Sequence, residues 1–208
     1  MLASKIYGVE DLRKVLRADV ELGAKELLGC LLVKGDMVAQ IVETEAYTWD
    51  DPGCHAYKKE RMKNMAMYGE PGTAYIYFTY GNHWMLNVVA DELGTPGAVL
   101  IRAAMPVSGI DQFEKNRPRI TRKEELLSGP GRLAKAFALD NLYNEIDLLN
   151  PDSEVRIVRH KYPTEIGITP RIGIAVGKGE ELMRRFIDVK LIHWTTKHKV
   201  NKTIFRDK

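Results

Sequence analysis

The chain has 208 residues, of which 28% are charged, and a net charge of +3. This length suits one domain with a sizeable core, and the composition is ordinary for a soluble globular protein. No stretch approaches the roughly 20 consecutive apolar residues of a membrane-spanning helix. The N-terminus lacks the apolar centre of a signal peptide. We therefore expect a soluble, intracellular protein with no membrane partner.

Basic residues are concentrated in two segments rather than spread evenly. One segment covers residues 115–135, and the other is the tail after residue 192. Such local density is what contact with phosphate groups requires. A solvated face or a frayed tail produces the same pattern, so this feature alone does not decide the partner.

The sequence offers no pattern for a metal or a cofactor. Its two cysteines, Cys30 and Cys54, are too few for a disulfide framework or a zinc site. The five histidines show no local metal-ligand spacing. A phosphate-binding P-loop, an HExxH motif and a serine nucleophile elbow are also missing from the sequence. We expect neither a metal nor a cofactor.

The N-terminal part predicts two helices and a hairpin. Asp11 and Asp19 are candidate N-caps, each followed by apolar residues at helical spacing, and Gly29 is placed to end the second helix. Residues 30–33 and 37–45 then read as two strands joined by a turn at Gly35.

The second of these strands ends in Glu43-Thr44-Glu45-Ala46-Tyr47. Because side chains alternate along a strand, Glu43, Glu45 and Tyr47 share one face. Two carboxylates near a buried strand end are costly unless they are paired or functional. The alternative is a strand end that simply turns out into solvent.

A long irregular segment, residues 48–72, carries His55 and several basic residues, and a loop of this length is functional or disordered. Residues 73–80 and 84–90 predict a β-hairpin that turns at Gly81-Asn82. Tyr80 stands beside that turn, where a large exposed ring needs a partner. A nucleic-acid reader could insert such a ring between bases.

The second half predicts a strand at residues 98–104, which contains Arg102; if buried, this arginine needs an anionic or carbonyl partner. Helices are expected at 110–116, around 124–127 and from Ser128 to 139. The glycine-rich entry to the last of these, with Ser128, Gly129 and Arg132, suits a phosphate. Further strands are expected at 155–158, 172–176 and 186–192.

These elements favour an α+β fold. We expect a single domain over residues 1–208, with a core at about 18–192 and a basic C-terminal tail at 193–208. Its centre is a curved, mainly antiparallel sheet with flanking helices and a protruding β-hairpin.

Carboxylates, aromatic rings, a lone arginine in a strand and basic segments together suit hydrolysis of a bond to a base or sugar. A glutamate would activate water, and rings would hold the flat part of the substrate. One alternative is a nucleic-acid-binding module without catalysis. Another is a sugar glycosidase that uses Glu43 and Glu45, although neighbours on one strand face lie too close to flank a glycosidic bond.

Several motifs, taken in order and spacing, closely resemble the alkyladenine (methylpurine) DNA glycosylase family. The resemblance covers roughly residues 18 to 192, and its strength lies in the series rather than in any one motif. The matching stretches are Glu43-Thr44-Glu45-Ala46-Tyr47, His55, Pro71-Gly72-Thr73-Ala74-Tyr75-Ile76-Tyr77, Tyr80-Gly81, Asn87, Val99-Leu100-Ile101-Arg102, Leu126-Leu127-Ser128-Gly129-Pro130 and Arg171-Ile172-Gly173-Ile174.

The resemblance implies a role for each matching residue. Glu45 is implied as the general base and Arg102 as the residue that helps to fix its water. The implied walls of the base pocket are Tyr47, His55 and Tyr77, and Asn87 crowds the 2-amino group of guanine. Tyr80 is implied as the wedge that fills the hole left in the duplex.

The implied substrate is double-stranded DNA that contains alkylated or deaminated purines. The base is flipped out of the helix at a cost of a few kcal/mol, and an abasic site remains. No lysine matches a Schiff-base nucleophile, so a monofunctional enzyme is expected. We also expect a monomer. If the source is a prokaryote, we expect it to be cytoplasmic and associated with the nucleoid. Glu43 is expected to make a structural hydrogen bond. Asn82-His83 and the loop 58–64 depart from the family pattern, which leaves their DNA contacts open.

Overall fold

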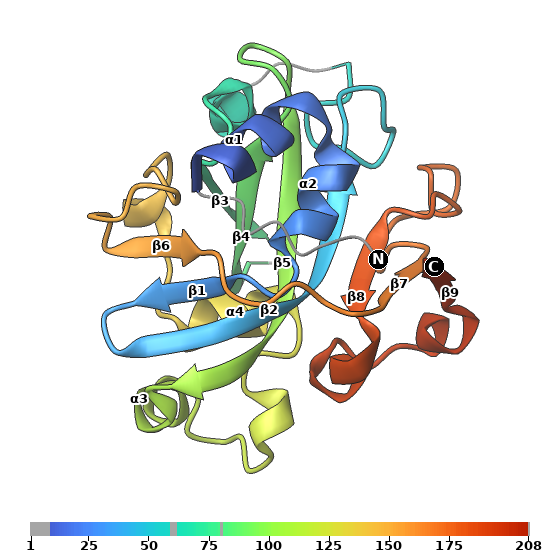
Figure 1. Cartoon of the computed structure of the whole chain (residues 1–208). Helices are drawn as coiled ribbons and strands as arrows, with labels where there is room; N and C mark the ends of the chain where they lie inside the picture. The colour runs from blue at the N-terminus through green and yellow to red at the C-terminus, as the bar shows by residue number, and fades with distance from the viewer. Residues whose placement is uncertain (1–8, 59–61, 80, 208) are drawn as a thin grey trace.

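A computed structural model of the chain describes residues 9–58, 62–79 and 81–207. Within them, nine strands form one sheet in which every pairing is antiparallel. The main path runs β3-β4-β5-β2-β8-β7-β9, and β1 joins β2 to β6. Figure 1 shows the sheet curling, with helices around it. The α+β fold with a curved antiparallel sheet, predicted from the sequence, is confirmed.

The centre of the sheet is β2 (Met37–Tyr47), an eleven-residue strand that is buried along most of its length. One edge pairs with β5 (Gly97–Ser108) throughout. The other edge pairs first with β1 (Leu31–Lys34) and then with β8 (Arg185–Asp188). The register between β2 and β5 shifts on both sides of Glu43, and such bulges bend a strand and redirect its side chains.

The expected hairpin is formed by β3 (Ala74–Thr79) and β4 (His83–Ala90) and lies at one edge of the sheet. β4 pairs in turn with the start of β5. The residue expected to act as a wedge, Tyr80, lies outside the described residues. On the hairpin's outer side the ring of Phe78 packs on Trp84, with 4.9 Å between the ring centres.

Helices α1 (Val9–Ala18) and α2 (Val20–Leu27) cover one face of β2, β4 and β5 (Figure 1). Asp19 caps α2 as predicted, since its carboxylate accepts from the backbone N–H groups of Glu21 and Leu22. Asp11 does not cap α1; it lies in the first turn, because the helix already begins at Val9.

The two faces of the sheet are used differently. Leu86, Val88 and Ile101 belong to the large apolar cluster beneath α1 and α2. Their neighbours in sequence, Asn87 and Leu100, point to the opposite face, where a cavity lies. The sheet therefore carries its main core on one side and its polar site on the other.

Short elements complete the second half of the chain: α3 (Ile110–Asn116), α4 (Pro130–Ala136), β6 (Val155–Val158), β7 (Ile166–Thr169) and β9 (Phe205–Asp207). Single-turn and short 3-10 helices lie between them: η1 (Met62–Tyr68), η2 (Lys123–Glu125), η3 (Asn141–Tyr143), η4 (Val189–Trp194) and η5 (Lys199–Thr203). The basic tail is part of the fold, because β9 pairs with β7 and Thr195 is 1% exposed.

Two strand predictions in this half are wrong. Residues 172–176 form a loop, since Gly173 and Gly177 both have positive φ and the Ile172 N–H bonds to a carboxylate instead of a neighbouring strand. The strand predicted for 186–192 ends at Asp188, which caps a 3-10 helix through the Lys190 N–H.

Other boundaries differ less. The helix expected from residue 128 to 139 covers only 130–136, and the one around 124–127 is a 3-10 turn. None of the helices in the described residues has the length and apolar character needed to cross a membrane.

The packing of α1 on α2 gives a stability prediction. Leu16 of α1 is 0% exposed and belongs to the main core, whereas Leu142 is 84% exposed. We expect Leu16→Ala to lower the free energy of unfolding by about 2–5 kcal/mol, because it removes buried methyl groups and leaves a cavity. The same change at Leu142 should alter it by about 0.5 kcal/mol or less. Urea denaturation measures both; equal losses would contradict the assignment of the core.

Candidate active site

Glu45, near the end of β2, is 0% exposed and fully hydrogen-bonded. Its Oε2 accepts from Arg102 Nη1 at 3.0 Å and from the Tyr47 hydroxyl at 2.8 Å. Its Oε1 accepts from the Ile172 N–H at 2.7 Å. A carboxylate that accepts from a guanidinium, a hydroxyl and an amide is held in one orientation.

Arg102, on β5, joins the two carboxylates of β2. Its Nε donates to Glu43 Oε1 at 2.9 Å and its Nη1 to Glu45, and the residue is only 5% exposed. Burial acts against its charged form, but Glu45 and Glu43 outweigh burial, so the pKa of Arg102 lies above its ordinary value. The anionic partner that the sequence required for this arginine is therefore a pair of glutamates.

Glu43 is held from three directions. Its Oε1 accepts from Arg102 and from Arg185 Nε at 2.7 Å, and its Oε2 accepts from the Thr196 N–H at 2.6 Å. Burial alone would raise the pKa of this carboxyl, but Arg102, Arg185 and the Thr196 N–H together lower it below its usual value. These bonds match the structural role expected of Glu43.

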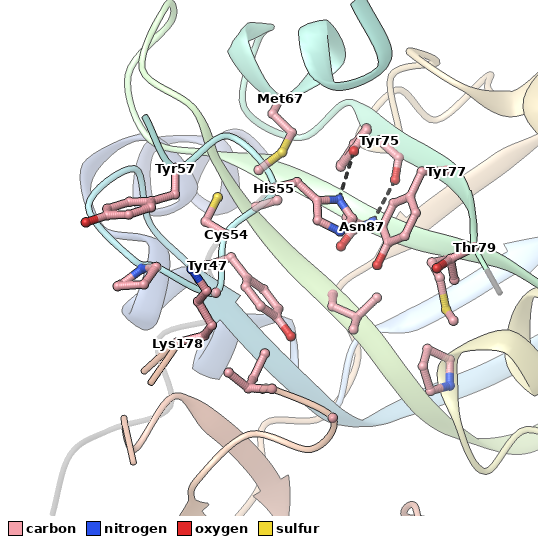
Figure 2. Close-up of a pocket in the computed structure, with 18 of the residues that line it drawn as sticks. Tyr47, Cys54, His55, Tyr57, Met67, Tyr75, Tyr77, Thr79, Asn87 and Lys178 are labelled. Atoms are coloured by element: carbon pink, nitrogen blue, oxygen red, sulfur yellow. Dashed lines mark hydrogen bonds between the residues drawn. The ribbon is translucent and has the colours of Figure 1, made fainter. Parts of the chain in front are cut away.

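A cavity of about 760 Å³ opens on this face of the sheet, a volume typical of small-ligand sites. Figure 2 shows Tyr47 apart from the pair His55 and Tyr77, whose ring centres lie 4.4 Å from each other. His55 Nδ1 lies 3.2 Å from the Tyr75 hydroxyl, and Asn87 Nδ2 donates to the Tyr75 carbonyl at 2.9 Å.

The structure brings most of the predicted site residues together. Tyr47, His55, Tyr77, Asn87 and Arg102 all line this cavity. Glu45 itself does not line the cavity. The residues that donate hydrogen bonds to it do, and they separate it from the open space: Tyr47, Arg102 and Ile172. The arrangement is therefore an aromatic-walled cavity with a charged floor.

The expected phosphate site looks different in the structure. The Ser128 side chain donates to the Thr195 carbonyl, and the residue is 4% exposed. The Gly129 N–H donates to the Arg102 carbonyl at 3.0 Å. Both donors thus have partners inside the protein. Arg132 alone among the three presents an exposed side chain.

Several residues of the site were missed from the sequence. Tyr75 was given no role in the pocket, although its position two residues before Tyr77 on β3 places it on the same face. Arg185 was given no role either and is 0% exposed. Ile172 contributes through its backbone N–H, for which a sequence carries no signal. No group of three or more potential metal ligands occurs in the part of the chain that the structure describes.

Comparison with known proteins finds relatives that match most of the chain. The family model described as methylpurine-DNA glycosylase matches residues 14–190. A protein of Francisella tularensis subsp. tularensis (strain SCHU S4 / Schu 4), named "Putative 3-methyladenine DNA glycosylase", is 38% identical over 183 residues, or 86% of this chain and 94% of that protein. A protein of the same name from Carboxydothermus hydrogenoformans is 42% identical over 173 residues, or 80% of this chain and 89% of that protein.

Glu43 gives a prediction for stability and its pH dependence. Glu43→Gln removes the charge that compensates two buried arginines, so we expect a loss of about 3–5 kcal/mol at pH 7. Because the folded pKa of Glu43 lies below the ordinary value of 4.5 for a glutamate, its contribution is complete above that value and is lost as the pH falls through the folded pKa. Acid should therefore destabilise the variant less steeply than the wild type.

Denaturant titrations at several pH values measure both effects. Glu70→Gln is the matched control, because Glu70 pairs with Arg17 at the surface, where the side chains are 48% and 43% exposed. An exposed pair contributes about 1 kcal/mol or less. Similar losses of stability for the two variants, with parallel pH profiles, would show that Glu43 does not compensate the charges of the two buried arginines.

Proposed function

The chain belongs to the methylpurine-DNA glycosylase family, and we propose that it hydrolyses the N-glycosidic bond of alkylated and deaminated purines in double-stranded DNA. The observation that carries this proposal is the fixed carboxylate of Glu45 at the floor of a cavity walled by aromatic rings. The product is an abasic site.

A purine inside a duplex cannot reach a carboxylate that lies behind the floor of a cavity. We therefore propose that the nucleotide is flipped out of the stack, at a cost of a few kcal/mol that is lowest for damaged or mispaired bases. Tyr80, which follows Thr79 in the sequence, would fill the gap in the duplex. The exposed guanidinium of Arg132 is our candidate for contact with a backbone phosphate.

Inside the cavity the flipped base would lie between Tyr47 on one side and His55 with Tyr77 on the other. Stacking on rings is worth about 1–3 kcal/mol per base, and a positively charged alkylated purine gains a further cation–π contribution. Asn87 is oriented by its bond to the Tyr75 carbonyl and would crowd the 2-amino group of guanine, which disfavours the normal base.

The water that attacks the sugar needs a free position on Glu45. Glu45 is 0% exposed, so a water reaches it only when one of its three partners moves. Arg102 is fixed by Glu43 as well, and the Ile172 N–H belongs to the backbone. We propose that the Tyr47 hydroxyl is the partner that yields when a base stacks on the Tyr47 ring.

Glu45 would then take a proton from the water while the water oxygen bonds to the anomeric carbon. The bond from that carbon to the purine nitrogen breaks, and its electron pair leaves with the base. Loss of a cationic base neutralises its charge, so such a base leaves readily. A neutral base such as hypoxanthine also needs protonation. Arg102 would orient Glu45 and its water throughout.

We propose a monofunctional mechanism for a monomer that acts in the cytoplasm on nucleoid DNA. Lys58 and Lys178 line the cavity, but both are exposed, whereas Glu45 and Arg102 are buried. An activated water at Glu45 accounts for base release without a lysine adduct. The alternative, a protein that binds damaged DNA without catalysis, is separated from this proposal by the first experiment below.

Glu45→Gln should lower base release by at least about 100-fold, because the amide cannot accept the proton of the water. The assay measures release of 3-methyladenine from methylated DNA and of hypoxanthine from a duplex that contains one such base, with strand scission only after alkali. Binding to the damaged duplex should be retained. If the wild type binds tightly but releases neither base, the chain is a damage-binding protein.

Tyr47→Phe should retain base release within a few-fold, since it keeps the stacking ring and removes only the hydroxyl that must leave Glu45. Tyr47→Ala should lose most activity together with the stacking. Single-turnover rates at saturating enzyme measure both variants. A loss in Tyr47→Phe as large as that in Tyr47→Ala would mean that the hydroxyl takes part in the reaction rather than yielding to it.

A further inference from the structure

A buried guanidinium covers one face of the Tyr47 ring. The Arg171 Cζ lies 4.5 Å from the ring centre, and Arg171 is 4% exposed. Tyr47 lines the cavity, but Arg171 is not one of the described residues that do so. One face of the ring is therefore in contact with a fixed positive charge, and the other side of the residue faces the space where a base would stack.

Arg171 is held tightly in this position. Nη1 donates to Asp51 Oδ2 and to the Ala46 carbonyl at 3.1 Å. Nη2 donates to Asp51 Oδ1 at 2.9 Å and to the Gly179 carbonyl at 3.2 Å. Asp51 is itself 1% exposed. The Tyr47 ring is thus next to the Arg171–Asp51 ion pair, and the guanidinium of Arg171 is in direct contact with the ring.

The charge behind the ring changes what the front of the ring can bind. An aromatic face attracts a cation through its quadrupole, but a second cation on the opposite face is repelled across the ring. Little water separates the two charges in a buried site, so this repulsion is weakly screened. Asp51 reduces the repulsion because its negative charge is bonded directly to the same guanidinium.

We propose that the Arg171–Asp51 pair sets the preference of the base pocket between cationic and neutral purines. The guanidinium lowers the advantage that a cationic alkylated base would otherwise have on Tyr47, and Asp51 limits that effect. The pair thereby suits the pocket to neutral lesions such as hypoxanthine as well as to methylated purines. This inference rests on the proposed function and assigns Arg171 and Asp51 as specificity-determining residues that act through Tyr47.

A purely structural role makes a different prediction. Arg171 also fixes the loop that holds the Ile172 N–H against Glu45. Loss of that support would slow the release of every base by the same factor. The ratio of the rates for a cationic and a neutral base therefore separates the two roles.

The experiment measures single-turnover release of 3-methyladenine from methylated DNA and of hypoxanthine from a duplex. Arg171→Gln should raise the ratio of the cationic to the neutral rate by about fivefold, which is the size of one cation–π contribution of about 1 kcal/mol. Asp51→Asn should lower the ratio, because it leaves the guanidinium uncompensated. Arg171→Lys keeps the charge and should preserve the wild-type ratio even if both rates fall.

Arg184→Gln is the matched control. Arg184 lies 3.6 Å from Asp51 Oδ2 and donates to Thr48 and Glu21, but the guanidinium over the Tyr47 ring is that of Arg171, so the ratio should not change. The double variant Arg171→Gln/Asp51→Asn avoids a lone buried charge. It removes both charges, so it should raise the ratio less than Arg171→Gln alone, which leaves the negative charge of Asp51 uncompensated.

Ratios that stay constant in all variants, or that move in the same direction for Arg171→Gln and Asp51→Asn, would overturn the inference while the wild type still releases both bases. Failure of the wild type to release either base would instead overturn the proposed function, and this inference with it. Far-ultraviolet circular dichroism of each variant confirms that the compared proteins are folded.

Discussion

Glu43 and Glu45 place two carboxylates on one face of a buried strand, and the structure depends on how these charges are compensated. Arg102 from β5 lies between them, and Arg185 from β8 closes the group at Glu43. All four residues are at most 5% exposed. A buried charge without a partner is strongly destabilising, so the three strands must meet in this register for the fold to form. The same contacts orient Glu45.

This network also explains why the C-terminal part of the chain belongs to the site. Thr196 donates its N–H to Glu43, and Ser128 donates to the Thr195 carbonyl. Ile172, on the loop before β8, donates to Glu45. The tail and this loop therefore complete a carboxylate site on a strand that lies more than a hundred residues earlier in the sequence. Aromatic residues from β2, β3 and the loop after β2 build the cavity above it.

The sequence predicted the parts of this arrangement that follow local rules. Alternation along β2 placed Glu43, Glu45 and Tyr47 on one face, and Arg102 was recognised as an arginine that needs an anion. Its partners could not be read from the sequence, because the register shifts beside Glu43 depend on tertiary packing. Arg171 and Arg185 were given no role, since pairing with carboxylates that are distant in the sequence leaves no local pattern. Residues 172–176 looked like a strand because apolar residues alternate there, while the glycines between them turn the chain.

The central claim is that Glu45 holds the attacking water below a base that is stacked on Tyr47. The most direct test is a crystal structure with a duplex that carries a non-hydrolysable 2′-fluoro analogue of deoxyinosine. We expect the base between Tyr47 and the pair His55 and Tyr77, and a water on Glu45 in place of the Tyr47 hydroxyl, facing the anomeric carbon. A base held elsewhere, or a water held by other residues while Tyr47 remains bonded to Glu45, would contradict this account.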